Sequence, residues 1–594
     1  MVIQSLCRYY EILADDPDCD IAKEGYSNTK VSAALVISKE GELVDVISLK
    51  VESGKGKKLV SRSMIVPEYT QPTSRVLSNF LCGSSSYVLG IGDLKNPERS
   101  KKCFFEFKKK HNEILKNTAS MHSKAVLLFL NKWDVEKALK NSVVKNNQDL
   151  LFEGGNIVFL LDGNGYIHED AEVKKLWERY KFKENDDIHM QCLISGKNSS
   201  IAELHLNKIK GIRNAQMAGA SLVSFNAPAY ESYGKKQSYN SPLSKKAAFA
   251  YTTVLNHMLL NQKQKIQIGD ATTVFWAESP NDIYPNLAMQ LFNPTTSEES
   301  DKPTKDIKTE RIIADVLKLA KEGKGIPSNI DDEINPLTKF YILGLSPNAS
   351  RISVRFFHGD TFGSFIEKTI QHYKDMKIIK DFENRPENIP IWQLLRETVS
   401  PKSNDKEAQP LLAGAIMRAI LSGGLYPQSL YTSIIQRVKA DCEIRVNYIR
   451  ASIIKAYLLR KAKITKNEKL KEVLTVALNE QTTDTAYLLG RLFAILEKTQ
   501  KDAGNETIRA RYFASAMATP KAVFPILLRL AQHHISKAEY GFVNDKKIET
   551  IMNSIEQFPS YLSLDEQGIF ILGYYQQRPK LWEKQIKENL KEEN

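Results

Sequence analysis

The order of apolar and polar residues predicts strands in the first part of the chain and only helices in the second. Between residues 31 and 50, the apolar runs VSAALVIS and ELVDVISL flank Lys39-Glu40-Gly41, which is typical of an antiparallel hairpin with glycine in its turn. Short apolar runs predict three more strands at Lys58–Val66, Ser86–Ile91 and Asn156–Gly163. Helical spacing and capping signals predict helices at Pro97–Lys116, Ala171–Tyr180 and Pro242–Gln262, the last with Ser241 as its cap.

A polar stretch and a second strand pair complete this first part. Residues Asn293–Lys308 are polar, contain proline and hold few apolar residues, which predicts a flexible insertion. The sequence FYILGLSPNASRISVRFF at Phe340–Phe357 then predicts a pair of strands, with Gly344, Pro347 and Asn348 supplying the break between them.

Beyond about Asp381 the strand pattern disappears and helical spacing replaces it. Apolar residues from Leu430 to Tyr457 recur every three or four positions, which predicts one long helix, and those at Leu488–Leu496 predict a second. The chain is therefore expected to have an α+β fold. A mixed α/β N-terminal region with antiparallel hairpins (1–380) precedes a helical connecting region (381–472) and an all-helical C-terminal bundle (473–594).

The net charge differs between the C-terminal bundle and the rest of the chain. The 594 residues carry 83 basic and 70 acidic side chains, which gives a net charge of +13. About 15 basic and 15 acidic residues lie between Val473 and Asn594, so the whole excess belongs to residues 1–472. This asymmetry favours contact of the first part with a polyanion, and surface solubility is the alternative explanation.

The remaining composition indicates a cytoplasmic protein with no membrane contact. No apolar run approaches the roughly 20 residues that a membrane span requires. The N-terminus also lacks the apolar core of a signal peptide. The six cysteines include no CxxC pair, which fits free thiols in a reducing compartment.

A search for catalytic and metal-binding patterns is mostly negative. The sequence has no HExxH, GxSxG or Walker A pattern and no paired His/Cys spacing that suits zinc. Residues Gly54–Lys58 lack the GK[ST] ending of a phosphate loop, so a basic turn is expected there. We therefore expect a protein that is not an enzyme and has no cofactor and no metal site.

The segment Gly211–Tyr251 has the composition of a nucleic-acid contact. From Arg213 to Asn240 it combines four aromatic and three basic residues with many amides and hydroxyls, and it holds a single acid, Glu231. Cations bind phosphate, aromatic faces stack on bases and amides read base edges. A surface loop rich in glycine and serine is the alternative interpretation. The DNA-binding candidates in this segment are Arg213, Asn214, Gln216, Asn226, Tyr233, Lys235, Lys236, Gln237 and Asn240.

Three basic clusters elsewhere are candidates for contacts with a phosphate backbone. They lie near residues 50–62, 95–110 and 445–463, and for each of them a solvated surface is the alternative interpretation. The phosphate-backbone candidates in these clusters are Lys55, Lys57, Lys58, Arg62, Lys101, Lys102, Arg445 and Arg450.

Several long strings of the sequence closely resemble one known family. They are GYSNTKVSAALVIS, SNFLCGSSSYVLG, QIGDATTVFWAE, FYILGLSPNASRISVRFF, AYLLGRLFAILEK, RARYFASAMATPKAVFPILLRLAQHH and DEQGIFILGYYQQR. In this order they resemble the large subunit of the type I-C CRISPR surveillance complex (Cascade), and the resemblance spans nearly the whole chain.

The resemblance implies a non-enzymatic subunit of an RNA-guided DNA-binding assembly in antiviral defence. Such a subunit recognises the protospacer-adjacent motif (PAM) in double-stranded target DNA and promotes opening and R-loop formation, while the guide reads the rest of the target by base pairing. Implied partners are the 5′ handle of the crRNA, the Cascade backbone subunits and a recruited helicase-nuclease that performs the cleavage. A small subunit, made from an internal start in the same gene and corresponding to the bundle from Val473, is a further implied partner.

A second loop competes with Gly211–Tyr251 for reading the PAM. Residues Gln71–Ser86 lie between predicted strands, and their amides suit adenine edges or minor-groove acceptors, while Phe80 suits a wedge between base steps. The candidates here are Gln71, Arg75, Asn79, Phe80, Ser84 and Ser85. For Asn79, a structural amide that caps a turn is the alternative. For the whole chain, a stand-alone DNA-binding protein and a nuclease with an unrecognised active site remain competing hypotheses.

Overall fold

The structure of the chain is a computed structural model that describes twelve stretches of it. They are residues 1–52, 59–69, 76–92, 96–116, 118–182, 187–205, 207–292, 334–405, 407–441, 446–504, 506–539 and 541–592. The chain forms two compact units. Unit 1 consists of Met1–Lys208 and Val223–His257, and unit 2 consists of Ile209–Leu222 and Met258–Asn594.

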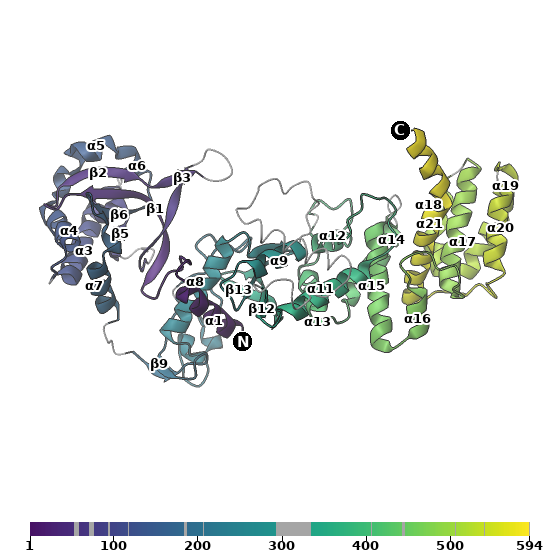
Figure 1. Cartoon of the computed structure of the whole chain (residues 1–594), viewed down its shortest axis with the longest axis horizontal. Helices are drawn as coiled ribbons and strands as arrows, with labels where there is room; N and C mark the ends of the chain where they lie inside the picture. The colour runs from purple at the N-terminus through teal and green to yellow at the C-terminus, as the bar shows by residue number, and fades with distance from the viewer. Residues whose placement is uncertain are drawn as a thin grey trace. The chain divides into compact units, whose positions relative to one another are not determined.

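Unit 1 is built on a seven-stranded sheet whose long central strand is β1 (Figure 1). Its strands are β1 (Tyr26–Ile37), β2 (Leu43–Ser48), β3 (Lys50–Glu52), β4 (Leu59–Pro67), β5 (Cys82–Gly83), β6 (Asn156–Leu161) and β7 (Gly165–Tyr166). One edge of β1 pairs antiparallel with β4 and then with β2, and the other edge pairs parallel with β6. The apolar residues of β1 are all buried, and the unbroken buried run Val31–Ile37 shows that both faces of the strand are covered there.

Helices cover this sheet and close a core of aromatic rings. Phe159 of β6 lies 5.9 Å from Phe129 and 6.0 Å from Phe107, measured between ring centroids, so helices α3 and α4 pack on the sheet through these rings. The helices of unit 1 are α1 (Val2–Asp15), α2 (Ser85–Val88), α3 (Pro97–Leu115), α4 (Met121–Lys132), η1 (Val135–Lys140), α5 (Ser142–Asn146), α6 (Gln148–Phe152), η2 (Ile167–Glu169), α7 (Ala171–Lys181), η3 (Pro228–Tyr230), η4 (Gln237–Asn240) and α8 (Lys245–Leu260), which runs on into unit 2. A short hairpin of β8 (His189–Gln191) and β9 (Asn198–Ser200) completes the unit.

Unit 2 contains a four-stranded antiparallel sheet in the order β10-β11-β12-β13. Its strands are β10 (Lys265–Ile268), β11 (Ala271–Ala277), β12 (Lys339–Asn348) and β13 (Arg351–Thr361). Every residue of β11 is buried. The helices α9 (Ile283–Phe292), α11 (Phe362–Met376) and α13 (Pro410–Ser422) pack against this sheet.

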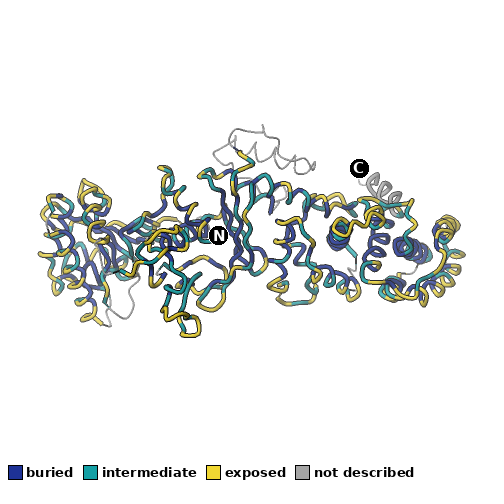
Figure 2. The backbone as a smooth tube through the Cα atoms, turned by 90° about the horizontal axis from the view of Figure 1, so that it is seen from below, coloured by how far each residue is buried: buried dark blue, intermediate teal, exposed yellow. Residues whose placement is uncertain are grey.

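The remainder of unit 2 is helical and ends in a bundle around α17 and α21 (Figure 1). Its helices are α12 (Ile391–Arg396), α14 (Gln428–Ala440), α15 (Tyr448–Thr465), α16 (Glu468–Val473), α17 (Thr485–Asp502), α18 (Ile508–Ala518), α19 (Pro520–Lys537), α20 (Gly541–Met552) and α21 (Leu564–Glu592). A Cβ atom added to Gly490 of α17 would lie 2.0 Å from the carbonyl oxygen of Phe570, so only glycine permits these two helices to cross this closely. Figure 2 shows the result: residues between the bundle helices are buried and those on the outer side are exposed.

The structure confirms the α+β fold class and most of the predicted elements. The hairpin around Lys39-Glu40-Gly41 is β1–β2, and the strands expected at Lys58–Val66 and Asn156–Gly163 are β4 and β6. The two helices predicted between residues 97 and 180 are α3 and α7. No strand follows residue 381 among the described residues. The finer division at 380 and 473 stays a prediction, and the insertion expected at 293–308 lies outside the described residues.

Four predicted elements are wrong in type or extent. Residues Ser86–Ile91 form the end of α2 and a turn instead of a strand, because Gly90 and Gly92 have positive φ angles that break an extended run. The helix α8 starts at Lys245, and the hydroxyl of Ser244 accepts the N–H of Ala247, so Ser244 caps it and Ser241 does not. The break between β12 and β13 lies after Asn348, whereas Gly344 and Pro347 are inside β12.

The predicted single helix over Leu430–Tyr457 is two helices, α14 and α15. Asp441 ends α14 in an extended conformation, and the side chain of Asn447 accepts the N–H of Arg450 and so caps the start of α15. The helical spacing of apolar residues continues in the sequence between α14 and α15, so the spacing does not show where one helix ends and the next begins. The caps at Asp441 and Asn447 mark the two ends.

A buried ionic cluster joins the sheet part of unit 2 to its helical part. Asp375, at the end of α11, accepts from Arg460 Nε at 2.8 Å and from Lys463 Nζ at 2.7 Å, both on α15. Lys455 Nζ donates to the Asp375 backbone carbonyl at 3.2 Å. Asp375, Arg460 and Lys455 are each at most 3% exposed. Burial raises the pKa of Asp375, but the bonds from Lys463 and Arg460 outweigh it and hold that pKa below its ordinary value.

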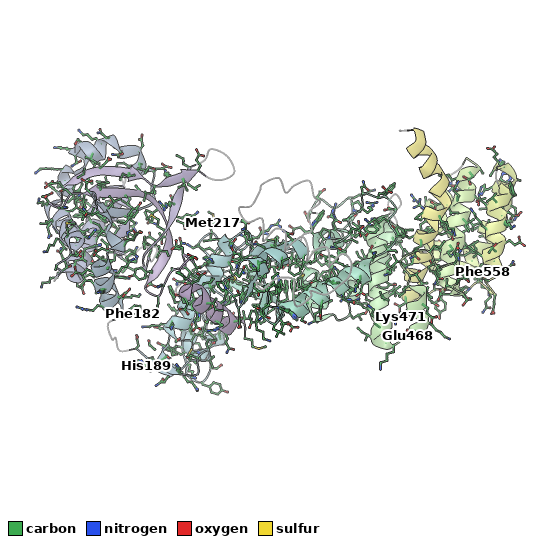
Figure 3. All side chains as sticks on the ribbon, in the orientation of Figure 1. Phe182, His189, Met217, Glu468, Lys471 and Phe558 are labelled. Atoms are coloured by element: carbon green, nitrogen blue, oxygen red, sulfur yellow. The ribbon has the colours of Figure 1, made fainter. Side chains whose placement is uncertain are left out.

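We expect Asp375→Asn to destabilise unit 2 by about 3–5 kcal/mol, since it leaves buried cations without their counter-charge. Denaturant unfolding followed by far-UV circular dichroism measures this loss. Glu468→Gln serves as the control, because the exposed pair of Glu468 with Lys471 on α16 contributes at most about 0.5 kcal/mol (Figure 3). Equal stability of the Asp375 variant and this control would contradict the role of the cluster.

Candidate nucleic-acid interface

The segment Gly211–Tyr251 is divided between the two units, with residues 211–222 in unit 2 and residues 223–251 in unit 1. The first part is a loop, Ile209–Ala220, closed at its base by two backbone hydrogen bonds of 2.9 Å between Ile209 and Ala220. The next residue, Ser221, bonds the backbone of Ser350 and Ile352 at the turn and start of β13. The backbone N–H of Arg213 donates to the hydroxyl of Thr272 on β11 at 3.1 Å. The loop is therefore held firmly by the four-stranded sheet.

The outer side of this loop presents a cation, two amides and an apolar side chain. Three of the DNA-binding candidates, Arg213, Asn214 and Gln216, are exposed. Arg213 pairs with Glu407 at 3.7 Å, and an exposed pair of this kind contributes little to stability. Met217 is 99% exposed at the tip (Figure 3). Met217 directly follows Gln216 in the chain, and proteins that bind the minor groove combine amides with apolar side chains.

The second part contains a tight turn in unit 1, Ser232–Lys235. The N–H of Lys235 donates to the carbonyl of Ser232 at 3.0 Å, and the two central residues, Tyr233 and Gly234, have φ angles of 53° and 67°. Positive φ at both central positions defines a type I′ turn. Glycine suits it, but an L-residue such as tyrosine pays about 1–2 kcal/mol for that conformation.

Asn240 holds this turn in place. Its Oδ1 accepts the N–H of Ser232 at 2.8 Å, and its Nδ2 donates to the carbonyls of Lys235 and Gln237 at 2.7 and 3.0 Å. Gln237 has a φ of 49°, and its N–H donates to Glu231 Oε1 at 3.3 Å. Asn240 was a base-reading candidate, but its amide is already engaged within the turn, which makes it a positioning residue.

The residues that remain available on this part are cationic and aromatic. Tyr233 is 98% exposed, and Lys235 and Lys236 are exposed and make no ion pair among the described residues. Asn226 is also exposed, whereas Gln237 is half-buried. The turn thus presents one aromatic face beside two ammonium groups.

The structure argues against a direct DNA contact by Asn79 and Phe80. Asn79 is 7% exposed and Phe80 is fully buried. The Phe80 ring stacks between His111 and Trp177, with centroid distances of 4.9 and 5.2 Å. A wedge would require this ring to leave the core, so Phe80 is a packing residue. Ser84 is half-buried and Ser85 is buried. Gln71 and Arg75 lie outside the described residues.

A neutral histidine fixes the loop that carries Asn79. His111 Nε2 accepts the N–H of Leu81 at 2.9 Å, so its Nδ1 carries the proton and donates to the carbonyl of Phe107 at 2.7 Å. Burial lowers the pKa of His111 to about 3. Next to it, Lys110 Nζ donates to the Ser78 carbonyl at 2.8 Å. These bonds show why the loop is a structural element.

The phosphate-backbone candidates divide into exposed and engaged side chains. Arg62 and Lys102 are exposed. Lys101 bonds Glu98 at 2.9 Å and Glu136 at 2.7 Å, so it is occupied within the protein. Arg450 is 2% exposed between Glu397 and Asp441, each at 2.7 Å, and is a structural cation and not a phosphate ligand. Lys55, Lys57, Lys58 and Arg445 lie outside the described residues.

Met217 is a candidate contact residue that sequence reasoning missed. Basic, amide and aromatic residues were selected by composition, and a methionine within GIRNAQMAGA matched none of these classes. The signal that could have found it is the pair of turn-forming glycines, Gly211 and Gly219, which frame an apolar residue in a polar loop.

Two further features, a metal-binding cluster and a membrane-spanning helix, are absent from the part of the chain that the structure describes. No group of three or more His, Cys, Asp or Glu side chains there is arranged to hold a metal ion. Within the same residues, every helix is too short or too polar to cross a membrane.

A comparison with known families finds one match that covers nearly the whole chain. The family is described as CRISPR-associated protein (Cas_Csd1), and its model matches residues 6–582. The match runs from α1 into α21 and includes residues of both units. No curated protein matches the chain.

We expect acid to unfold unit 1 through His111. The native imidazole stays neutral down to about pH 3, whereas the unfolded one binds a proton near pH 6.5, so stability falls as the pH falls between these values. From pH 7.5 to pH 5.0 the loss through this residue is about 2 kcal/mol. Denaturant unfolding of His111→Gln at the two pH values should show an acid-induced loss smaller by that amount.

His189→Gln is the matched control for this measurement, since His189 is exposed on β8 (Figure 3). Its acid-induced loss of stability should equal that of the unaltered protein. An unaltered acid sensitivity in His111→Gln would show that His111 is not the buried neutral group described above.

Proposed function

We propose that this chain, which belongs to the Cas_Csd1 family of CRISPR-associated proteins, is the large subunit of a type I-C RNA-guided surveillance complex. In this role it binds double-stranded target DNA, recognises the PAM and promotes duplex opening and R-loop formation. The guide RNA reads the remaining target by base pairing.

The observation that carries the DNA-binding part of this proposal is the loop Ile209–Ala220. It places a cation, two amides and a methionine on one exposed turn that is hydrogen-bonded to a sheet at its base. Such a turn keeps its shape when it binds, so little ordering entropy is lost. In the minor groove, amides distinguish A·T from G·C pairs, and an apolar side chain unstacks a base step.

Charge supports the same assignment. The excess of positive charge lies in residues 1–472, and Arg62 and Lys102 of unit 1 are exposed cations. Contacts of this kind hold any DNA sequence and bring the complex to its target, while base contacts distinguish the PAM. The bundle from Val473 carries no net charge, which fits binding to protein more than to a polyanion.

The partners follow from this role. They are the 5′ handle of the crRNA, the Cascade backbone subunits, a small subunit that corresponds to the C-terminal bundle, and a helicase-nuclease. We assign no enzymatic step and no cofactor to the chain, and DNA cleavage belongs to the recruited helicase-nuclease.

The competing functions make different predictions. A stand-alone DNA-binding protein binds a specific duplex tightly without guide RNA, whereas a complex subunit needs its partners for stable target binding. A nuclease cuts DNA as the purified chain. Binding assays with and without the guide complex, together with a cleavage assay of the chain alone, separate the three.

We expect Gln216→Ala to weaken PAM recognition by the assembled complex. Loss of one base-edge contact costs about 1–3 kcal/mol of discrimination, so the ratio of affinities for PAM and non-PAM duplexes should fall at least about fivefold. Electrophoretic mobility shifts of the two duplexes measure this ratio. Arg62→Ala is the control, because loss of a phosphate contact should weaken both duplexes about equally. An unchanged ratio in Gln216→Ala would remove this residue from PAM reading.

We expect Met217→Ala to impair duplex opening more than duplex binding. The methionine provides the apolar wedge, and without it the complex must unstack the first base step unaided. Permanganate reactivity of unpaired thymines next to the PAM should fall several-fold. Met217→Leu keeps an apolar side chain and should retain opening. On a target whose first base pairs are already mismatched, Met217→Ala should match the unaltered complex, and an equal defect on this target would contradict a wedge.

A further inference from the structure

Tyr233 combines an unfavourable backbone conformation with almost complete exposure. Its φ of 53° belongs to a turn type whose central positions usually hold asparagine, aspartate or glycine. Strain of this kind persists where the surroundings enforce it, and it concentrates at functional sites. Packing does not explain the tyrosine here, because its side chain is 98% exposed.

The turn that carries Tyr233 is built to stay closed. Asn240 makes its three hydrogen bonds to Ser232, Lys235 and Gln237, and the N–H of Ser238 donates to the carbonyl of Glu203 at 3.1 Å. Ser238 is 2% exposed and anchors the neighbouring η4 in unit 1. The ring is therefore displayed from a preorganised base and does not sit on a loose loop.

The charge beside the ring favours an anionic ligand. Lys235 and Lys236 are exposed, and the nearest acid in the sequence, Glu231, accepts the N–H of Gln237 at 3.3 Å. An aromatic face next to two ammonium groups matches the repeating base and phosphate of a single nucleic-acid strand. In a duplex the base faces are covered by their neighbours, so a lone ring reaches a base face only where a strand is unpaired.

We propose that the ring of Tyr233 stacks on an unpaired base of single-stranded DNA, and that Lys235 and Lys236 bind the phosphates next to that base. The ring in this role is called the stacking post. The source of this strand rests on the proposed function, since opening of a target duplex releases unpaired DNA. Asn240 acts as a positioning residue that keeps the ring in its displayed orientation.

The test measures binding of the full-length chain to a fluorescein-labelled 12-nucleotide oligothymidylate by fluorescence anisotropy at two salt concentrations. Tyr233→Ala should raise the dissociation constant by about fivefold or more, which is the effect of losing one stacked base. Tyr233→Phe keeps the ring and should stay within about twofold of the unaltered chain. Asn240→Ala, which releases the turn, should give an intermediate loss.

The salt dependence separates stacking from charge. Lys235→Ala with Lys236→Ala should lower the slope of log affinity against log salt by about 1.4, since each phosphate contact on a single strand contributes about 0.7. Tyr233→Ala should leave this slope unchanged. Tyr561→Ala is the matched control, because this tyrosine is 75% exposed in the helical bundle and has no part in the turn, and its binding should be unaltered.

Four outcomes would overturn the proposal. They are no measurable binding of the oligothymidylate by the unaltered chain, equal affinity of Tyr233→Ala and the unaltered chain, a loss in Tyr233→Phe as large as in Tyr233→Ala, and a loss in Tyr561→Ala as large as in Tyr233→Ala. A loss seen only with a 12-nucleotide oligouridylate would overturn the assignment to DNA.

The stacking proposal and the proposed function can be disproved independently of each other. If the assembled complex opens PAM-containing targets while Tyr233→Ala binds the oligothymidylate normally, the stacking post is wrong and the proposed function stands. If Tyr233→Ala loses oligothymidylate binding while the complex does not discriminate the PAM, the stacking post stands and the proposed function falls.

Discussion

The buried carboxylate of Asp375 is the interaction on which the arrangement of unit 2 depends. It lies at the end of α11, next to the four-stranded sheet, and holds two cations of α15. The same helix reaches the C-terminal bundle, where Lys461 bonds Asp565 of α21 at 2.5 Å. Arg460 also donates to the carbonyls of Ala419 and Gly424, so a single guanidinium joins three segments of the chain. Because a buried charge without its partner is costly, these elements keep one arrangement.

The candidate interface follows a different principle, since its side chains are exposed and its order comes from backbone bonds. The loop Ile209–Ala220 is closed by a pair of hydrogen bonds and braced by Thr272, and the turn at Tyr233 is held by Asn240. Exposed residues contribute little to stability, so their identity is free to serve binding. The two most exposed large apolar side chains among the described residues, Met217 and Tyr233, both stand on such braced turns.

Sequence reasoning selected a segment in which several candidate residues are exposed, but it misjudged the burial of single residues in other places. Phe80 and Arg450 had the chemistry of a wedge and of a phosphate ligand, yet both are buried in packing and ionic contacts. Local composition does not distinguish an arginine that faces water from one that faces Glu397 and Asp441, which lie 53 and 9 positions away along the chain. For the same reason the sequence did not show that the amide of Asn240, a residue type that suits a base contact, instead holds a turn in place by hydrogen bonds.

By itself the sequence determined the α+β class, most of the helices and strands, and the segment rich in cations, amides and aromatic rings, because periodicity and composition are local properties. The tertiary structure alone decided which of these side chains are available. Burial of Phe80, pairing of Arg450 and display of Met217 and Tyr233 all depend on partners from distant parts of the chain or on the exact φ of one residue. Exposure is a property of the assembled fold, and no single stretch of sequence encodes it.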